Sequence, residues 1–210
     1  MAKLYFRYGA MNSGKSTALL QVAYNYEERG QRVVLAKPRV DVKGDADIVS
    51  RLGVTRRVDM LVRPGDDIHE SFHAVANRDP GAPEGAGAVR PVAAVLIDEA
   101  QFLTRHQVDD LLRLAVLEDV PVLAYGIRTD FRTEVFPGAA RLLEIAHSVE
   151  ELKTICRCGR KAIFNARRVG GRFVFAGDQV AIDGVDSTYE SLCASCYLAE
   201  SGGTLGDDPA

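Results

Sequence analysis

The stretch GAMNSGKST, from Gly9 to Thr17, has glycine, lysine and hydroxyl residues at the spacing G-x-x-x-x-G-K-[ST]. Glycines let a backbone wrap closely around a phosphate chain, so that successive N–H groups point at its oxygens. A lysine at this position reaches the outer phosphates, and the hydroxyl that follows it ligates Mg²⁺. The stretch therefore predicts a phosphate-binding loop (P-loop) for a nucleoside triphosphate. The expected nucleotide-binding residues are Gly9, Ala10, Met11, Asn12, Ser13, Gly14, Lys15, Ser16 and Thr17.

The residues around this loop have the periodicity of a strand and a helix. Residues 3–8 (KLYFRY) alternate apolar and polar side chains, and residues 16–29 are typical of a helix that Gly30 ends. We expect further strands at 32–36, 54–62, 92–97 and 120–125, and helices at 68–76, 104–117 and 138–146, with Thr104 as an N-cap. This order predicts an α/β fold, a P-loop (RecA-like) sheet that is mostly parallel and has helices on both faces.

The composition is that of an ordinary globular protein. The chain has 210 residues, of which 47% are hydrophobic and 26% charged, so it can bury a sizeable core. A net charge of −3 and a pI near 5.8 argue against a dedicated nucleic-acid-binding protein. No apolar run approaches the ~20 residues of a membrane-spanning helix, and the first strand starts too early for a signal peptide. We therefore expect a cytoplasmic protein with no membrane partner.

The chain changes character near residue 150. From Leu152 on, Gly-rich turns and two cysteine pairs replace the helical periodicity, and residues 167–182 are typical of a hairpin. We expect a P-loop α/β domain over residues 1–150, a small zinc-ribbon-like domain over 151–200 and a disordered tail over 201–210. Within the first domain, we expect the polar residues 39–53 to form a mobile loop over the site. The Gly/Pro/Ala-rich residues 78–91 are expected to be a connector.

Two acidic residues, Asp98 and Glu99, directly follow the apolar run at 92–97. An acid at the carboxyl end of a buried strand beside the phosphate-loop strand helps to hold Mg²⁺, and we assign this role to Asp98 together with Ser16. Glu99 then has the position of a general base toward the group that attacks the γ-phosphate. Alternatively, Glu99 only caps the helix that follows. Because many ATPases activate water with a second acid, this pair does not by itself separate a kinase from an ATPase.

The loop at 125–136 (YGIRTDFRTEVF) follows the last buried strand and opens toward the same end of the sheet. Apolar and aromatic side chains such as Ile127 and Phe131 suit a flat base, and Arg128 and Arg132 suit phosphates. From the residues alone, this interpretation is hardly stronger than that of an ordinary surface loop.

Four cysteines form two close pairs, C-R-C at 156–158 and C-A-S-C at 193–196. Four thiolates in two pairs suit a tetrahedral, structural Zn²⁺ ion in a reducing compartment. The first pair is C-x-C rather than C-x-x-C, and the 34 residues between the pairs exceed the usual gap of about 15–20. The alternative is a set of free thiols in a small core. The expected zinc ligands are Cys156, Cys158, Cys193 and Cys196.

Two further sets of residues have no clear role in the sequence. Six basic residues between 157 and 172 are expected to form a solvated face, with some phosphate contact at most. The four histidines at 69, 73, 106 and 147 fit no ligand or triad spacing, and we expect them to be structural or exposed.

Taken in order, these motifs resemble those of the type II thymidine kinases, which are found in bacteria and in the animal cytosol. The resemblance runs from about Leu4 to Tyr197, and the ordered set is more specific than any single motif. It implies a P-loop kinase with a zinc-bearing lasso domain. The motifs are GAMNSGKST at Gly9, KP followed by Asp41, SRLG at Ser50, DEAQF at Asp98, YGIRTDFR at Tyr125, the cysteine pairs, and Tyr189 four residues before Cys193.

The resemblance also implies a reaction, ATP + thymidine → dTMP + ADP. Glu99 is implied to take the proton of the 5′-hydroxyl, while Lys15 and Arg51 stabilise charge on the transferring phosphoryl group. The lasso loop is implied to close over the base, to read it largely through main-chain groups and to exclude water. The implied walls of the base pocket are Met11, Phe102, Ile127, Phe131 and Tyr189.

Two positions depart from the family pattern. Residues 182–184 (IDG) stand where the family often has Gly-Gly, and the distance from Ile182 to Tyr189 is one residue longer than is common. Lys43 stands where bacterial members often have arginine, so the charge is kept but bidentate phosphate binding is lost. The resemblance further implies a homotetramer. A pathway enzyme of this kind is also expected to be inhibited by its end product dTTP, which would occupy both substrate sites.

Two other functions fit parts of the sequence. One is a P-loop ATPase acting as a motor or switch, but a helicase needs two such α/β domains and this chain has room for one. The other is an ATP-regulated zinc ribbon that binds nucleic acid through the basic residues at 157–172. The acidic balance and the lack of interleaved exposed aromatic residues weigh against it, so we expect no nucleic-acid partner. Strong, salt-sensitive binding in a gel shift would favour this alternative.

Overall fold

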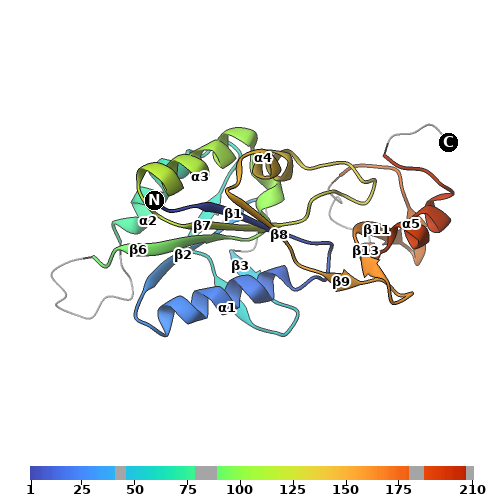
Figure 1. Ribbon diagram of the computed structural model, residues 1–210, viewed down its shortest axis with the longest axis horizontal. Coiled ribbons are helices and arrows are strands. Elements are labelled where there is room, and N and C mark those ends of the chain that lie inside the picture. The colour runs from blue at the N-terminus through green and yellow to red at the C-terminus, as the bar shows by residue number, and fades with distance from the viewer. Residues whose placement is uncertain (41–45, 79–88, 180–186, 207–210) are drawn as a thin grey trace.

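The computed structural model describes residues 1–40, 46–78, 89–179 and 187–206. Its main feature is a six-stranded sheet in the order β5-β2-β6-β7-β1-β8, in which all neighbouring strands are parallel (Figure 1). The predicted α/β fold with a parallel sheet is confirmed. The six strands are β1 (Leu4–Tyr8), β2 (Arg32–Pro38), β5 (Met60–Val62), β6 (Val92–Ile97), β7 (Val122–Gly126) and β8 (Ser148–Glu151).

The two central strands, β6 and β7, are apolar along nearly their whole length because both faces of the sheet are covered. The side chains of Val95, Leu96 and Ile97 in β6 are fully buried, although successive residues of a strand point to opposite faces. A parallel strand between two layers of helices needs apolar residues on both of its faces. This is why the continuous apolar run at 92–97 predicts β6 with the correct bounds.

Helices cover both faces of the sheet, as predicted (Figure 1). Helix α1 (Lys15–Glu27) lies on one face, where Leu19 joins a core cluster with Leu35 and Leu96. Helices α2 (Ile68–Ala76), α3 (Arg105–Leu117) and α4 (Pro137–Ile145) lie on the other face and share the larger core cluster. Thr104 begins α3 as predicted, because it forms a capping box with Gln107.

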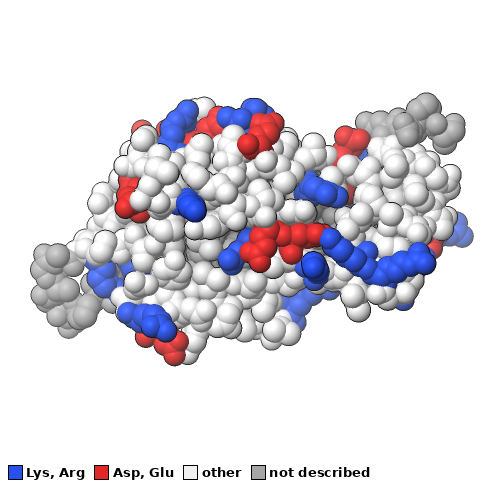
Figure 2. Space-filling model, in the orientation of Figure 1, with Lys and Arg blue, Asp and Glu red and all other residues white. Residues whose placement is uncertain are grey.

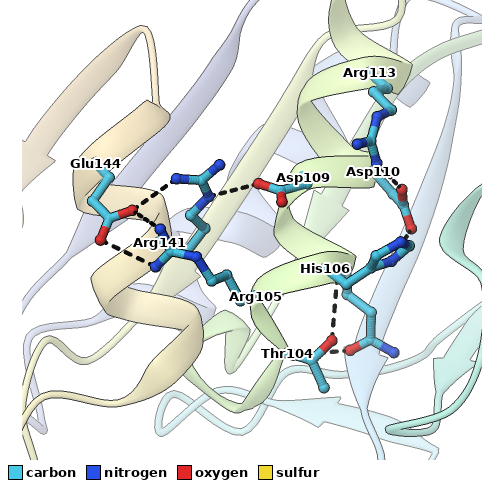
Figure 3. A network of polar contacts seen from close by, with 9 residues as sticks. Thr104, Arg105, His106, Asp109, Asp110, Arg113, Arg141 and Glu144 are labelled. Carbon is cyan, nitrogen blue, oxygen red and sulfur yellow. Dashed lines mark hydrogen bonds and ion pairs between the residues drawn. The ribbon is translucent and has the colours of Figure 1, made fainter.

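Helices α3 and α4 are joined by charged side chains on their outer surface (Figure 3). The Arg141 Nε atom of α4 lies 2.6 Å from Asp109 Oδ1 of α3, and Arg105 Nη2 of α3 lies 2.7 Å from Glu144 Oε2 of α4. Arg141 and Glu144 also pair within α4 at 2.8 Å. Each such exposed pair contributes little alone, but the four groups form one network that fixes the two helices against each other.

The chain after Glu151 forms a smaller, antiparallel region. Its own core surrounds Tyr197, whose side chain is 1% exposed, and includes Phe164, Cys156 and Cys193. One two-stranded sheet pairs β9 (Thr154–Ile155) with β10 (Lys161–Ala162). A second sheet has the order β12-β11-β13 and is followed by helix α5. The elements of this second part are β11 (Phe164–Val169), β12 (Arg172–Val174), β13 (Ser187–Leu192) and α5 (Ala194–Ser201).

Residues 47–62 differ from the sequence prediction. The single strand expected at 54–62 is wrong, because this segment contains β4 (Thr55–Arg57), which is exposed, and β5, which enters the main sheet. The loop expected at 39–53 includes β3 (Asp47–Val49), which pairs with β4 as an antiparallel hairpin. The chain bends between β4 and β5 at Asp59, whose N–H and carboxylate both bond to the backbone of Leu35 at 2.8 Å.

Strand β8 is not predicted from the sequence. It lies at the edge of the sheet, where β1 is its one partner among the described strands, and residues 148–150 are exposed. A polar edge strand lacks the alternation by which strands are recognised.

Several sequence predictions lie outside the described residues. These are the positions of Asp41, Lys43 and residues 182–184, most of the connector at 78–91, and the last four residues of the tail. The described part of the tail has hydrogen bonds, since the Gly206 N–H donates to the Arg132 carbonyl at 2.8 Å. Among the described helices, none has both the length and the apolar character needed to cross a membrane.

Candidate active site

The phosphate loop runs from the end of β1 to the start of α1, and its backbone requires glycine at two places. Gly14 precedes α1 with a φ of 78°, in the left-handed region that glycine adopts at little cost. Gly9 lies so close to its surroundings that a Cβ atom there would be 2.4 Å from the Leu152 carbonyl oxygen. The predicted strand, loop and helix are therefore present in the order that phosphate binding needs.

Lys15 is folded beneath this loop. Its side chain is buried, and its Nζ atom donates to the carbonyl oxygens of Ala10 at 3.0 Å and Gly9 at 3.3 Å. Burial lowers the pKa of Lys15, while the nearby charges of Glu99 and Asp98 act in the opposite direction. A cation at this place, inside a loop of backbone N–H groups, fits the phosphates of a nucleotide.

Asp98 at the end of β6 accepts a hydrogen bond from the Ser16 hydroxyl at 2.8 Å. The expectation that β6 lies beside β1 is wrong, because β7 separates the two strands. The two side chains meet all the same, because α1 begins over the carboxyl ends of these strands. Burial and the charge of Glu99 raise the pKa of Asp98 to about 6, although the hydrogen bond from Ser16 acts to lower this pKa. A hydroxyl and a carboxylate in contact are oxygen ligands that fit Mg²⁺.

Glu99 has a left-handed backbone, with a φ of 52°, at the start of the 3₁₀ turn η1 (Ala100–Phe102). Although it holds the N-cap position of this turn, its side chain makes no capping hydrogen bond. The carboxylate instead lines the cleft described below and accepts a hydrogen bond from the Gln101 amide. The alternative that Glu99 serves only as a cap is therefore not supported.

Gln101 is a site residue that the sequence analysis missed. Its side chain is fully buried, and its Oε1 atom accepts a hydrogen bond from the Ile127 N–H at 3.1 Å. Because its amide nitrogen donates to Glu99, Gln101 links the acid after β6 to the loop after β7. Gly126 leaves the space for it, since a Cβ atom there would lie 2.6 Å from Gln101 Oε1.

A cleft of about 1160 Å³ lies between the phosphate loop, the β3–β4 hairpin and strand β13. It brings together most of the predicted catalytic and base-binding residues, but Phe102 and Phe131 are not among the residues that line it. Phe102 packs edge to face on Phe136, and the Phe131 ring lies 3.7 Å from the guanidinium carbon of Arg167. The predicted residues that line the cleft are Met11, Asn12, Gly14, Lys15, Ser16, Thr17, Arg51, Glu99, Ile127 and Tyr189.

Two residues of the antiparallel region hold the backbone N–H and C=O groups of Met11, and neither is predicted from the sequence. Asn165 of β11 accepts a hydrogen bond from the Met11 N–H at 2.7 Å, and the Ser191 hydroxyl of β13 donates to the Met11 carbonyl. The Asn165 amide also donates to the Thr129 carbonyl at 2.9 Å. The side chains of Asn165 and Ser191 are buried, so these bonds are shielded from water.

The four cysteines converge at one point, with their Sγ atoms within 4.8 Å of one another. A tetrahedral zinc site with Zn–S bonds of about 2.3 Å has sulfur–sulfur separations of about 3.8 Å, so this arrangement fits zinc. A hydrogen bond from the Cys196 backbone N–H lowers the pKa of Cys193 and so favours the thiolate that a metal needs.

Three of the six basic side chains between residues 157 and 172 form ion pairs within the fold. The face drawn in Figure 2 shows acidic side chains beside basic ones near its middle, and a run of basic side chains that continues toward the right. These ion pairs reduce the positive charge that the segment offers to a nucleic-acid backbone. The ion pairs are Arg157 with Glu190 and Glu200, Lys161 with Glu151, and Arg168 with Glu190.

Comparison with known proteins gives a consistent result. A family model described as thymidine kinase matches residues 2–197. A thymidine kinase of Ruegeria pomeroyi is 45% identical over 204 residues, which is 96% of each chain. A thymidine kinase of Legionella pneumophila (strain Paris) is 45% identical over 208 residues, 98% of this chain and 92% of the relative. One of Mesorhizobium japonicum is 43% identical over 210 residues, 99% of this chain and 97% of the relative. The chain therefore belongs to the thymidine kinase family of ATP-dependent phosphotransferases.

Proposed function

We propose that this protein transfers the γ-phosphate of ATP to the 5′-hydroxyl of thymidine, and of deoxyuridine, to give the nucleoside monophosphate and ADP. The observation that supports this most directly is the position of Glu99. Its carboxylate faces the same cleft as Lys15, Ser16 and Tyr189, so a proton acceptor, a phosphate loop and an aromatic wall border one space. The reaction belongs to pyrimidine deoxynucleotide salvage in the cytoplasm.

The phosphate side of the cleft binds ATP. The N–H groups of the first turn of α1 and the ammonium of Lys15 hold the phosphates. Arg51, which also lines the cleft, stabilises the charge of the transferring group. Ser16 and Asp98 hold Mg²⁺, which neutralises charge on the β- and γ-phosphates when it is bound. Because Lys15 is buried, its interaction with a phosphate is less screened than it would be in water.

Glu99 is the general base of the proposed reaction. It accepts the proton of the 5′-hydroxyl as the oxygen attacks the γ-phosphate. Gln101 positions it by donating a hydrogen bond to its carboxylate, and Gln101 is itself fixed by the Ile127 N–H. The base therefore has a defined direction before substrate arrives, which lowers the entropic cost of the reaction.

The nucleoside base binds next to Met11, Ile127 and Tyr189, which line the cleft. Phe102 and Phe131, which the family resemblance also assigns to the base pocket, are not among the described residues that line the cleft. Main-chain groups of the lasso loop read the edge of the base, and the loop excludes water so that transfer prevails over hydrolysis. Residues 180–186 of this loop are outside the described part of the chain.

The small domain, residues 151–200, holds a structural zinc ion through Cys156, Cys158, Cys193 and Cys196. Zinc joins the start of this domain to the start of α5. Because the hydrophobic core of the domain is small, the binding of zinc supplies part of its folding free energy. Its consequence for catalysis is indirect. The domain that zinc stabilises supplies Asn165 and Ser191 to the phosphate loop and Tyr189 to the cleft.

We further propose that dTTP inhibits the enzyme by occupying both sites, its base in the nucleoside pocket and its triphosphate in the phosphate loop. One continuous cleft borders both sets of residues, which gives a single ligand of that length a place to bind. The active species is a homotetramer, as the family resemblance implies.

The experiment that tests this proposal incubates the protein with Mg·ATP and each of five nucleosides: thymidine, deoxyuridine, deoxycytidine, deoxyadenosine and deoxyguanosine. Nucleoside monophosphate and free phosphate are measured separately. We expect monophosphate from thymidine and deoxyuridine only, and less of it as dTTP is added. Free phosphate without monophosphate would instead make the protein an ATPase and would direct attention to the zinc domain's partner.

A further inference from the structure

Two histidines and a glutamate meet on the surface between α2 and α3. The expectation that no histidine has a ligand spacing is wrong for His69 and His73, which are four residues apart on α2 and therefore lie on one face of it. Their Nε2 atoms are 3.2 Å apart. Glu118, which ends α3, places its Oε1 atom 2.6 Å from the Nε2 of His69 and 3.3 Å from that of His73.

Two of the three separations, at 3.2 and 3.3 Å, are close to the roughly 3.3 Å between ligands of a tetrahedral zinc ion, and the third, at 2.6 Å, is shorter. Edges of 3.2, 2.6 and 3.3 Å form a triangle whose corners are about 1.8 Å from its centre, so an ion about 1 Å above that centre is about 2.0–2.1 Å from all three atoms, the bond length of zinc to imidazole and carboxylate. The 2.6 Å contact between His69 and Glu118 has to lengthen for the ion to reach tetrahedral angles.

We propose that His69, His73 and Glu118 form a second metal site, which binds a divalent transition ion of the zinc type. Two imidazoles and one carboxylate are the ligands that zinc shares with other borderline metals, and water completes the coordination. Ions reach the site from solvent, because the side chains of His69 and His73 are 56% and 41% exposed. The site differs in chemistry from the four-thiolate cluster.

The proposed role of this site is to join α2 to the end of α3. His73 and Glu118 are separated by 45 residues, and the ring of His73 packs on Phe72, which belongs to the main core. An ion that binds only the folded arrangement stabilises it by mass action. None of the three residues lines the active-site cleft, so the effect concerns stability rather than turnover.

The test measures zinc bound to the purified holoenzyme, with its cysteine site filled, by equilibrium dialysis and metal analysis. We expect two zinc ions per chain in the wild type and one in the His69→Ala/His73→Ala variant. The matched control is His106→Ala, which removes an exposed histidine that pairs with Asp110 on α3, and it should keep two. Added zinc should raise Tm by a few degrees in the wild type and the control but not in the double variant.

The competing arrangement contains protons only, with each ring donating to one oxygen of Glu118. In that case the wild type binds a single zinc ion. The Tm of the double variant then lies below that of the wild type by the same amount with and without added zinc. Either result would overturn the proposal. Glu118→Gln is a second variant if the histidine changes impair folding, because an amide still accepts hydrogen bonds but is a weak zinc ligand. Retention of both ions in Glu118→Gln and in the double variant would also overturn it. Cobalt bound at this site should lack the thiolate charge-transfer absorption of the cysteine site.

Discussion

The side-chain oxygen of Asn165 accepts a hydrogen bond from the backbone N–H of Met11 at 2.7 Å, although the two residues are 154 positions apart. The same side chain donates to the Thr129 carbonyl, so one residue of the small domain holds both the phosphate loop and the loop after β7. The backbone of the loop at 9–17 is therefore held by a residue outside the six-stranded part of the fold. We infer that the small domain positions both sides of the cleft.

Asn165→Ala should lower kcat/KM for ATP by about 10–100-fold, because loss of two buried hydrogen bonds costs about 1–3 kcal/mol and leaves the Met11 N–H unpaired. Zinc content should not change, which separates this effect from loss of the small domain. The matched control is Asn25→Ala, since the Asn25 side chain is exposed and bonds only within α1. Unchanged kinetics in Asn165→Ala would show that the phosphate loop holds its shape without the small domain.

Glu99→Gln should leave ATP affinity nearly unchanged and reduce kcat by about 10²–10⁴-fold, because an amide cannot accept the proton of the 5′-hydroxyl. The measurements are kcat with thymidine and the Kd for ATP. Glu144→Gln, a change to an exposed carboxylate of the α3–α4 network, is the control. Turnover near that of the wild type would assign the role of base to another group.

Cys193→Ser should reduce bound zinc and lower Tm, because Cys193 is buried in the core of the small domain as well as being one of the four converging thiols. Metal analysis and thermal unfolding of the same sample give both numbers. Ser195→Ala, two residues further on, is the control because its hydroxyl does not belong to the thiol cluster. A full equivalent of zinc at the cysteine site, together with an unchanged Tm, would contradict a structural zinc.

Asp98→Asn should change how stability depends on pH in protein free of Mg²⁺. Burial and the charge of Glu99 raise the pKa of Asp98 from 3.8 to about 6, so the folded protein keeps a proton there that the unfolded chain has already released. This carboxyl therefore lowers the free energy of unfolding as pH rises from about 4 through 6, by about 1–3 kcal/mol. Asparagine does not titrate and should lose that contribution. Urea unfolding at pH 4.5 and 7.5 measures the difference, and equal pH dependence in wild type and variant would contradict it.

The phosphate loop, the buried strands and the cysteine set could be predicted from the sequence, because each depends on chemistry that is local in the chain. Gly14 is needed by the turn itself because its φ is positive, and the apolar run at 92–97 is what a strand covered on both faces requires. The capping box at Thr104 is contained within four residues. The order of these motifs was enough to indicate the family.

The tertiary structure alone decided which distant residues meet. The exposed β8 strand has no periodic signal, and only its pairing with β1 makes it part of the sheet. The bond between Asn165 and Met11, and the contact of His73 with Glu118, depend on how whole elements pack against each other. Hydrophobic periodicity records which face of an element is buried, but it does not record which polar residue lies opposite. The shape of the loops and the residues they touch were therefore settled by packing, whereas the type of each element was settled by the sequence.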